Sequence, residues 1–358
     1  MLSYIIRRLL LVFPTLIGIT VVVFGVMAMS PGGISAPLTT KDSGMSPEVR
    51  KALQAYLDKR YGINDPAYVQ YGRWLNKISP VGFKYDVDYN YVGFGFKWPD
   101  LGESFVFNRP VTQLIAEHLP ITLLLNTMSI PFVYAIAIGV GMYSARYRGK
   151  FFDIATGTLF LALWSIPTIW AGVLLIGFFA SSDFLQWFPA NGLHDLHARD
   201  MSFLPFTDED GWHRGWLLDM MWHLCLPVIC LSYGSFAFLT KLNRTAVLEN
   251  LSADFVRTAR AKGVSDTKVL FRHVLRNSLI PLITVAAHIL PSLLAGSVIV
   301  ESIFGIQGMG KLTVEAITLR DREVVLTTTL ISGLLGLAGY LIADILYAIA
   351  DPRVSYES

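Results

Sequence analysis

Six long apolar stretches alternate with polar segments along the chain. They cover residues 9–29, 119–142, 154–180, 222–240, 278–300 and 324–349. A helix of about 20 consecutive apolar residues can cross the hydrocarbon core of a bilayer, and each stretch has about that length. The pattern therefore predicts an all-α integral membrane protein with six transmembrane helices.

The first stretch follows a basic head that contains Arg7 and Arg8, an arrangement that a secretory signal peptide would share. No small residues with the spacing of a cleavage site close the stretch, and it is long enough to span the membrane. We therefore expect an uncleaved first transmembrane helix with its N-terminus in the cytoplasm.

Proline recurs inside the apolar stretches. Because a proline removes a backbone donor and disturbs the turn before it, each one predicts a kink in its helix. The residues concerned are Pro120, Pro131, Pro167, Pro281 and Pro291. Pro167, in the run Ser165–Trp170, is the one that we expect to matter most.

Lysine and arginine are sorted between the polar connections. The connection Ala145–Lys150 is short and basic, and the longer connection at residues 241–277 is basic as well. The connections on the other side are rich in aspartate and glutamate. Cytoplasmic loops carry an excess of Lys and Arg, so both basic connections belong on the side of Arg7 and Arg8. This sorting predicts that the N- and C-termini are both cytoplasmic.

The same sorting divides the chain into parts. We expect a first transmembrane helix with its head at 1–30, a long extracytoplasmic insertion at 31–118, a five-helix transmembrane domain at 119–350 and a cytoplasmic tail at 351–358.

Within the insertion, Pro47–Arg60 predicts a short surface helix. Residues 85–98 form an aromatic-rich, strand-like segment. Its rings could contact a ligand, lie at the membrane interface or pack within a small extracytoplasmic lobe, and packing is the commonest role of clustered aromatic side chains.

Composition removes several functional classes. The formal net charge is only +2 in a chain that is 53% apolar, so no field that would attract nucleic acid is expected. Cys225 and Cys230 lie in one apolar run without the spacing of a metal-binding pair, which favours packing. No nucleophile elbow and no HExxH motif occurs. We therefore expect no cofactor, no resident metal and no catalytic site: the chain is not an enzyme.

Two weaker motifs do not change this picture. Gly305–Lys311 has the spacing of a phosphate-binding loop, but Leu312 replaces the Ser or Thr that would hold magnesium, and no strand precedes it. Four polar residues in one irregular segment could suggest a metal site, but they lack a recognised ligand spacing. They are His194, Asp195, His197 and Asp200.

The basic connection contains a helix–glycine–helix pattern. Ser252 is a plausible N-cap of the first piece, and Gly263 stands where a helix C-cap needs a positive φ. Ser265 or Asp266 can cap the second piece. Apolar residues give each piece one apolar face, through Phe255, Val256 and Ala259 in the first, and through the pairs Leu270–Val274 and Phe271–Leu275 in the second. A separate basic stripe carries Lys268, Arg272 and Arg276.

Three roles are open to such a loop on physical grounds. It can dock into a groove on a partner protein, or it can lie on anionic lipid. It can also be an ordinary cytoplasmic loop, because such loops carry an excess of Lys and Arg.

A resemblance narrows these alternatives. The loop has Arg257-Thr258-Ala259, three further residues and Gly263, and it ends on Leu279-Ile280-Pro281. It resembles the cytoplasmic coupling loop of permease subunits in binding-protein-dependent ABC importers, with Arg-Thr-Ala where the generic family pattern has Glu-Ala-Ala. The runs RTARAKG and HVLRNSLIP resemble the dipeptide/oligopeptide branch. The likeness extends from IIRRLLLVFPTLIGITVVVF near the start to LIADILYAIADPRVSY near the end.

The resemblance implies a permease subunit that forms half of a translocation pathway for di- or oligopeptides, or related small solutes. An extracytoplasmic binding protein would deliver the cargo, a second homologous permease would pair with this chain as a heterodimer, and two cytoplasmic ATPase subunits would hydrolyse ATP. The membrane would be the cytoplasmic (inner) membrane of a bacterium or archaeon. The residues implied in ATPase coupling are Phe255, Arg257, Thr258, Ala259, Arg260, Gly263, Leu270 and Arg272.

A self-contained secondary transporter or channel is the alternative from another class. Such a protein needs coupling groups near the middle of the membrane and often has internal repeats. We find no repeat, and only Asn126 and His288 lie near the middle of a span. These two residues could line the pathway or bond a neighbouring helix.

Overall fold

The computed structural model describes most of the chain as helix. The described residues are 2–29, 65–86, 90–104, 106–208, 211–294 and 298–350, together with Glu48, Lys51, Ala55, Asp58 and Gly62. The predicted surface helix at Pro47–Arg60 falls almost wholly outside them, as does the tail at 351–358. The chain forms two compact units: one comprises Met1–Ile5, His118–Leu312 and Leu335–Ser358, and the other Ile6–Glu117 and Thr313–Leu334.

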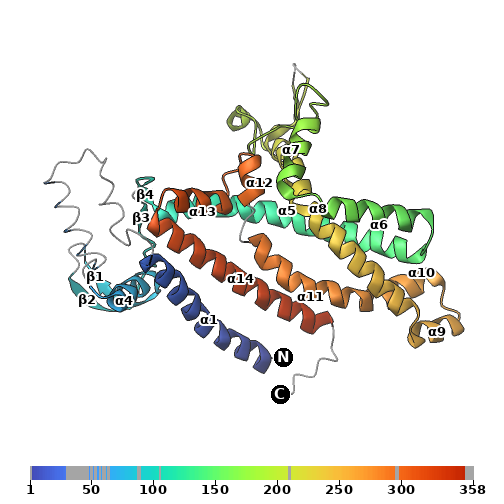
Figure 1. Ribbon diagram of the computed structural model, residues 1–358, viewed down its shortest axis with the longest axis horizontal. Helices are drawn as coiled ribbons and strands as arrows, with labels where there is room; N and C mark the ends of the chain where they lie inside the picture. Colours follow the sequence, from blue (N-terminus) through green and yellow to red (C-terminus); the bar gives the residue numbers. More distant parts are fainter. Residues whose placement is uncertain are drawn as a thin grey trace. The chain divides into compact units, whose positions relative to one another are not determined.

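The helices of the first unit, labelled in Figure 1, carry four of the six apolar stretches: 119–142, 154–180, 222–240 and 278–300. In chain order they are α5 (Val111–Arg146), α6 (Phe151–Trp164), α7 (Thr168–Phe179), α8 (Gly215–Leu251), α9 (Asp254–Ala261), α10 (Asp266–Lys268), a π-helical turn (Val269–Val274), α11 (Leu275–Leu294) and α12 (Val298–Ile303). Helix α8 packs against α6, α7 and α11. One apolar core lies among α5, α7, α8 and α12, and its fully buried side chains include Leu125, Leu224, Leu226, Phe304 and Ile306.

The second unit contains helix α1 (Leu2–Ala28) from Ile6 onwards and a small lobe. The lobe consists of α4 (Ala67–Ile78) and the antiparallel hairpin β1 (Val81–Tyr85) with β2 (Tyr91–Phe96). Helices α13 (Met309–Thr318) and α14 (Arg322–Ala350) each run from one unit into the other. Four short strands form two further hairpins: β3 (Glu103–Ser104) pairs with β4 (Arg109–Pro110) in the second unit, and β5 (Phe206–Asp208) pairs with β6 (Gly211–His213) in the first. A 3-10 turn at Ala198–Asp200 also belongs to the first unit.

The apolar helices agree with several of the predicted spans. Within the described residues, four helical segments are long and apolar enough to cross a membrane: Val111–Arg146, Gly215–Leu251, Asp266–Ala286 and Arg322–Ile342. Helices α6 and α7 count as a fifth span if they are taken together. The first predicted span contains a shorter apolar helix at Leu10–Gly25. Six spans therefore remain a prediction.

The third predicted span, 154–180, breaks into two helices at Pro167, where the sequence predicted a kink. Helices α6 and α7 meet at an angle of 105°. Pro167 stands at the N-cap of α7 with an extended backbone, because proline cannot donate to the preceding turn. The freed carbonyl of Ile166 accepts a hydrogen bond from the Tyr233 hydroxyl at 2.5 Å. Helix α8 thereby supplies the bond that the broken helix lacks.

Helices α5 and α8 approach closely at Gly141. The Asn243 side-chain amide of α8 donates to the carbonyls of Ala137 and Ile138 on α5, at 3.1 and 3.2 Å. A Cβ atom at Gly141 would lie 2.8 Å from Asn243 Nδ2 and 3.0 Å from the backbone oxygen of Thr240. Glycine is therefore required by the helix spacing itself.

We expect Gly141→Val to lower the free energy of unfolding by about 1–3 kcal/mol, as overpacking of a close contact does. Thermal denaturation of the purified protein in detergent measures the change. Gly139→Val is the matched control, because nothing lies within 4 Å of a Cβ atom there. An equal loss in both variants would contradict the close-contact explanation.

Candidate functional site: the basic helical loop

The basic loop begins where α8 ends. Ser252 has a helical backbone and its hydroxyl donates to the carbonyl of Glu249 at 2.8 Å, so it closes α8. The residue before α9 is Ala253, which has no side-chain capping bond. The prediction of Ser252 as the N-cap was therefore wrong, because its hydroxyl is used by the preceding helix. Ser265 does precede α10, but it also makes no side-chain cap bond.

Gly263 ends α9 in the conformation predicted from the sequence. Its φ is +79°, its amide donates to the carbonyl of Arg260 at 2.9 Å, and the Val264 amide donates to that of Ala259 at 3.2 Å. These two bonds form a Schellman motif, which needs a left-handed residue at this position. Nothing lies within 4 Å of a Cβ atom built on Gly263. The backbone angle alone therefore requires glycine.

The apolar side of the loop packs onto the chain itself. Val256, Ala259, Leu270 and Val274 are buried in one cluster, which we call the loop core. The remaining buried members come from α5, α8 and the π-helical turn: Met142, Ala145, Val247 and Val269. Ala259 and Leu270 are thus covered by the chain's own helices. They hold the loop in place and are not available to a partner.

The π-helical turn changes the second predicted apolar pair. Leu270 and Val274 are both buried, as expected. Phe271, however, is 58% exposed, whereas Leu275 packs against the loop core, so this pair does not share a face. A π-helical turn spaces its bonds five residues apart instead of four, so the four-residue periodicity used for the prediction does not hold there.

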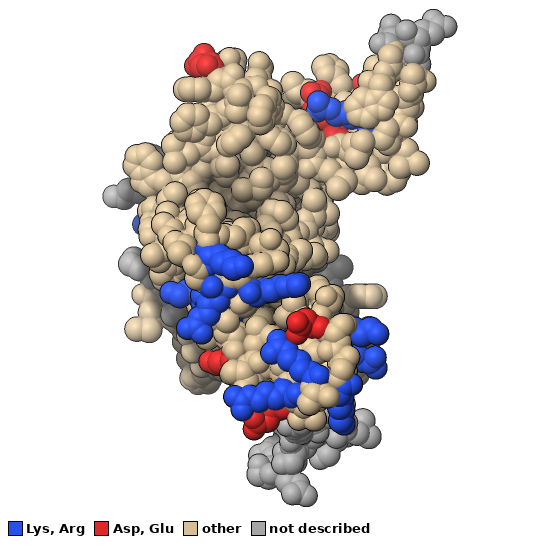
Figure 2. Space-filling model, turned by 90° about the vertical axis from the view of Figure 1, so that its right-hand side faces the viewer, with Lys and Arg blue, Asp and Glu red and all other residues tan. Residues whose placement is uncertain are grey.

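The outer face of the loop is basic with two aromatic side chains. Phe255 is 39% exposed and lies on α9, and Phe271 follows α10. The other exposed residues of the loop include Arg257, Thr258, Arg260, Lys262, Lys268, Arg272 and Arg276, together with the acidic Asp254 and Asp266. Arg260 bonds Asp266 at 3.0 Å and so links the two pieces of the loop. Figure 2 shows that Lys and Arg side chains gather on this side of the molecule with few acidic side chains among them.

A second basic turn, Arg146–Lys150, joins α5 to α6. Arg146 and Lys150 both lie over the ring of Tyr147, at 5.8 and 5.1 Å from its centre. Gly149 has a φ of +73°, and its amide donates to a carboxylate oxygen of Asp153 at 2.9 Å. The turn is therefore tied to the start of α6.

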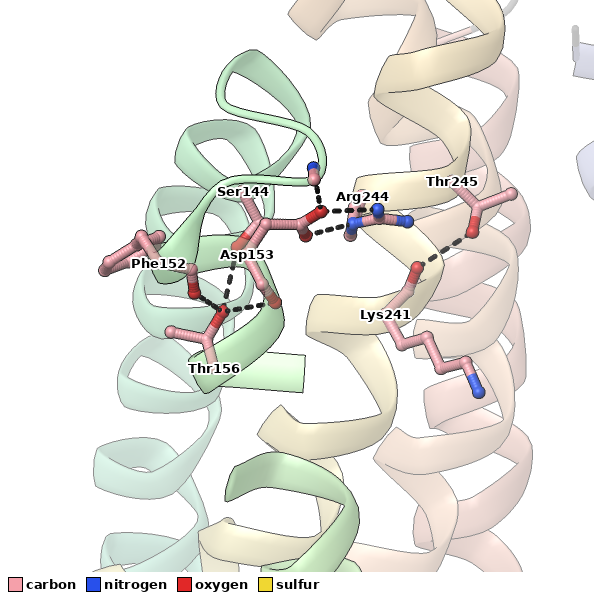
Figure 3. Close-up of polar contacts among 8 residues, drawn as sticks. Ser144, Phe152, Asp153, Thr156, Lys241, Arg244 and Thr245 are labelled. Atoms are coloured by element: carbon pink, nitrogen blue, oxygen red, sulfur yellow. Dashed lines mark hydrogen bonds and ion pairs between the residues drawn. The ribbon is translucent and has the colours of Figure 1, made fainter. Parts of the chain in front are cut away.

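Asp153 also forms a paired contact with α8. The Nε and one terminal nitrogen of Arg244 donate to its two carboxylate oxygens at 2.5 and 2.8 Å (Figure 3). The Asp153 side chain is buried, and Ser144 and Thr156 bond each other beside it at 3.1 Å. The sequence analysis missed this ion pair. Its only signals were an aspartate and an arginine at the ends of two apolar stretches.

An open groove of about 720 Å³ lies beside this ion pair. Its polar lining comes from Ser144, Asp153, Thr156, Thr158, Thr240, Lys241 and Arg244, and its apolar lining includes Ile154, Phe160, Leu161, Trp164 and Phe238. The groove combines a polar end with aromatic walls and contains neither a histidine nor a cysteine.

Of the two candidate pathway residues, Asn126 and His288, the structure describes the side chain of Asn126 only. Asn126 is buried, and its amide nitrogen donates to the carbonyl of Thr122 one turn earlier at 2.7 Å. It therefore bonds its own helix in this conformation. The backbone of His288 belongs to α11, but its side chain lies outside the described residues.

The Gly305–Lys311 loop surrounds a carboxylate of the chain itself. Glu301 is fully buried, and its two oxygens accept from the Thr122 hydroxyl at 3.1 Å and from the Lys311 amide at 2.8 Å. A Cβ atom at Gly308 would lie 2.5 Å from the Glu301 carboxyl carbon. The glycines thus leave room for Glu301, which occupies the loop amide that a phosphate would need.

We expect Lys311→Ala to leave the nucleotide affinity of the assembled transport complex unchanged. The reason is that the loop already holds a carboxylate and that Leu312 cannot bind magnesium. Equilibrium binding of a fluorescent ATP analogue to wild-type and variant complexes measures the affinity. A nucleotide photocrosslink that maps to Gly305–Lys311 would show that the expectation is wrong.

The two histidines of the polar segment have different partners: His194 lies 3.7 Å from a carboxylate oxygen of Asp219, whereas the exposed His197 pairs with Asp195 at 3.2 Å. The Asp195 amide donates to Asp219 at 2.9 Å, and His194 stacks on Trp216 with ring centres 4.5 Å apart. Burial lowers the pKa of His194. Among the described residues, no group of three or more His, Cys, Asp or Glu could hold a metal ion.

Apolar helices of spanning length, joined by a basic helical loop, define a multi-pass helical membrane protein. The chain belongs to the family of binding-protein-dependent transport system inner membrane components. The model of that family matches residues 137–356, and the model of its N-terminal part matches residues 1–126.

Several curated relatives match the chain over its whole length. It is 38% identical over 99% of its length to the complete oligopeptide transport system permease protein AppB of Bacillus subtilis. It is 34% identical to the di/tripeptide transport system permease protein DppB of Pseudomonas aeruginosa, over the full length of both chains. The peptidoglycan transport system permease protein YejB of Agrobacterium fabrum is 31% identical, with 99% of this chain and 98% of the relative covered.

A solved structure shares the fold. It is the inward-facing MetNI methionine ABC transporter, with a TM-score of 0.50 and 17% sequence identity, covering 67% of this chain and 97% of the matched one. About two thirds of the chain therefore shares its fold with one chain of that transporter.

Proposed function

We propose that this chain is the permease subunit of an ATP-driven importer of short peptides, and that it forms half of the translocation pathway. The full-length relatives named for oligopeptides and for di/tripeptides support peptide cargo. The family description, which names a binding-protein-dependent system, supports delivery by an extracytoplasmic binding protein. The membrane is the cytoplasmic (inner) membrane of a bacterium or archaeon, crossed six times with both termini inside.

The basic loop is the proposed site where ATP hydrolysis is coupled to transport. The observation that carries this role is its division into a buried side, which packs on α5 and α8, and an outer side with Phe255 and Phe271 among basic residues. Exposed aromatic side chains on a face rich in arginine and lysine fit a groove with an acidic rim on a cytoplasmic ATPase. The polar residues proposed to contact the ATPase are Arg257, Thr258, Arg260 and Arg272, all exposed.

The partners follow from this arrangement. Two partner ATPase subunits are proposed to supply ATP hydrolysis, because the one phosphate-loop-like motif of the sequence, Gly305–Lys311, has Leu312 where magnesium binding needs Ser or Thr. We propose that a second homologous permease completes the pathway as a heterodimer with this chain.

Uptake by reconstituted vesicles tests the function. Vesicles that contain this permease, its partner permease and the ATPases are expected to accumulate a labelled di- or tripeptide only when ATP and the loaded binding protein are both present. Uptake without ATP would favour a secondary transporter or channel. ATP-dependent uptake of another solute, without uptake of any peptide, would support the proposed permease function. It would also show that peptides are not the cargo.

We expect Ser265→Cys to be labelled only from the cytoplasm and Ser202→Cys only from outside. The reason is that Lys and Arg concentrate around Ser265, whereas acidic residues surround Ser202. A membrane-impermeant maleimide applied to intact cells measures the accessibility of both positions, in a background without Cys225 and Cys230. Labelling of Ser265→Cys from outside, with none at Ser202→Cys, would reverse the proposed orientation.

A further inference from the structure

The hairpin of the small lobe has two chemically different faces. Val81 pairs with Phe96, Phe83 with Phe94 and Tyr85 with Tyr91, so these six side chains share one face. All six are between 50% and 66% exposed. The ring centres of Phe83 and Phe94 are 5.5 Å apart, and those of Phe83 and Tyr91 are 6.0 Å apart. The aromatic face is therefore one continuous apolar surface.

The opposite face is small, polar and attached to α4. Gly82 pairs with Gly95 and Lys84 with Gly93 on this side. The Asn76 side chain of α4 accepts from the Phe83 amide at 2.8 Å and donates to the Phe83 carbonyl at 3.0 Å. A Cβ atom at Gly82 would lie 2.3 Å from Asn76 Oδ1, so glycine admits this contact. Because α4 packs here, the lobe itself leaves the aromatic face uncovered.

Helix α4 in turn is fixed to the last turns of α1. Tyr71 and Trp74 of α4 pack on Phe24 of α1, with ring centres 5.5 and 5.9 Å apart. The Tyr71 hydroxyl bonds that of Thr20 at 2.9 Å. At 1.5 Å per residue, Thr20 lies about 12 Å from the end of α1 at Ala28. The lobe is thus held beside the final stretch of an apolar helix.

We propose that the aromatic face of the β1–β2 hairpin inserts into the phospholipid interface of the bilayer, beside the end of α1. Together with the polar opposite face it makes the hairpin an amphipathic element that lies in the membrane surface. The inference rests on the proposed position of α1 across the membrane.

Two physical arguments favour lipid as the environment of the aromatic face. Helix α1 is about 40 Å long at 1.5 Å per residue, and the hydrocarbon core is about 30 Å thick, so its end lies at the level of the headgroups. Tyr, Trp and Phe with nearby lysines are the side chains that favour this layer.

Spin labels on the two faces test the proposal. Phe94→Cys carries a nitroxide on the aromatic face, Tyr91→Cys is a second position on that face, and Lys84→Cys is the matched control on the other. All three positions are exposed, so the labels should not disturb folding. The labelled permease, in a background without Cys225 and Cys230, is assembled with its partner subunits in vesicles of phosphatidylethanolamine and phosphatidylglycerol. Its accessibility to oxygen and to a water-soluble nickel complex is then measured.

The ratio of oxygen to nickel accessibility is expected to be severalfold higher at Phe94→Cys and Tyr91→Cys than at Lys84→Cys. Equal, high nickel accessibility at all three positions would show a water-exposed face and overturn the proposal. Low accessibility to both reagents at the aromatic positions would show a protein partner instead and would also overturn it. Peptide uptake by the same vesicles is measured as well. It tests the proposed function independently of the position of the hairpin, so a failure of one proposal can be told from a failure of the other.

Discussion

Arg244→Ala is expected to lower the free energy of unfolding by about 2–3 kcal/mol. The change leaves the buried carboxylate of Asp153 without its paired partner, and an uncompensated buried charge is costly. The figure lies below the usual range for a fully buried pair because the Arg244 side chain is 31% exposed. Thermal denaturation of the purified permease in detergent measures the loss, and uptake by vesicles should fall with the amount of folded protein.

Two further variants make this prediction specific. Arg272→Ala removes an exposed arginine with no ion pair among the described residues, and it should change the stability by less than about 0.5 kcal/mol. The double change Asp153→Asn with Arg244→Gln removes both charges and should recover part of the loss. If Arg244→Ala is no less stable than Arg272→Ala, the ion pair does not stabilise the α6–α8 contact.

Gly263→Val is expected to abolish most ATP-driven uptake while the protein still folds and inserts. A β-branched residue at a φ of +79° costs about 1–2 kcal/mol or more, which is relieved if the chain leaves the left-handed conformation. That movement would break the two Schellman bonds and tilt α9 relative to α10. The exposed side chains of Phe255 on α9 and Phe271 after α10 would then change position relative to each other. The measurements are copurification of the ATPase subunits and uptake by reconstituted vesicles.

Gly263→Asn is the matched control for this change. Asparagine tolerates the left-handed conformation far better than valine does, so the variant should keep most of its docking and uptake. The space around Gly263 is open, so side-chain size alone predicts no difference between the variants. Full docking and full uptake in Gly263→Val would contradict the coupling role. The basic residues of this segment would then reflect only its location in the cytoplasm.

The sequence alone predicted the features that depend on local pattern. Runs of about 20 apolar residues predicted helices, and four such segments are long and apolar enough to span a membrane. Gly263 was predicted as a left-handed helix end, and its φ confirms this. Pro167 predicted a disturbed helix, and the chain does break there. Each of these signals is contained within a few neighbouring residues, so no knowledge of the packing was needed.

The tertiary structure decided everything that depends on residues far apart in the chain. The bend of 105° at Pro167 is set by how α7 packs on α8, where Tyr233 bonds the carbonyl of Ile166. Asp153 and Arg244 meet only because α6 lies against α8. Ala259 and Leu270 looked available for docking, but neighbouring helices cover them. A periodic pattern identifies which side of a helix is apolar, but whether that side meets the chain itself, lipid or a partner depends on the packing of the other helices.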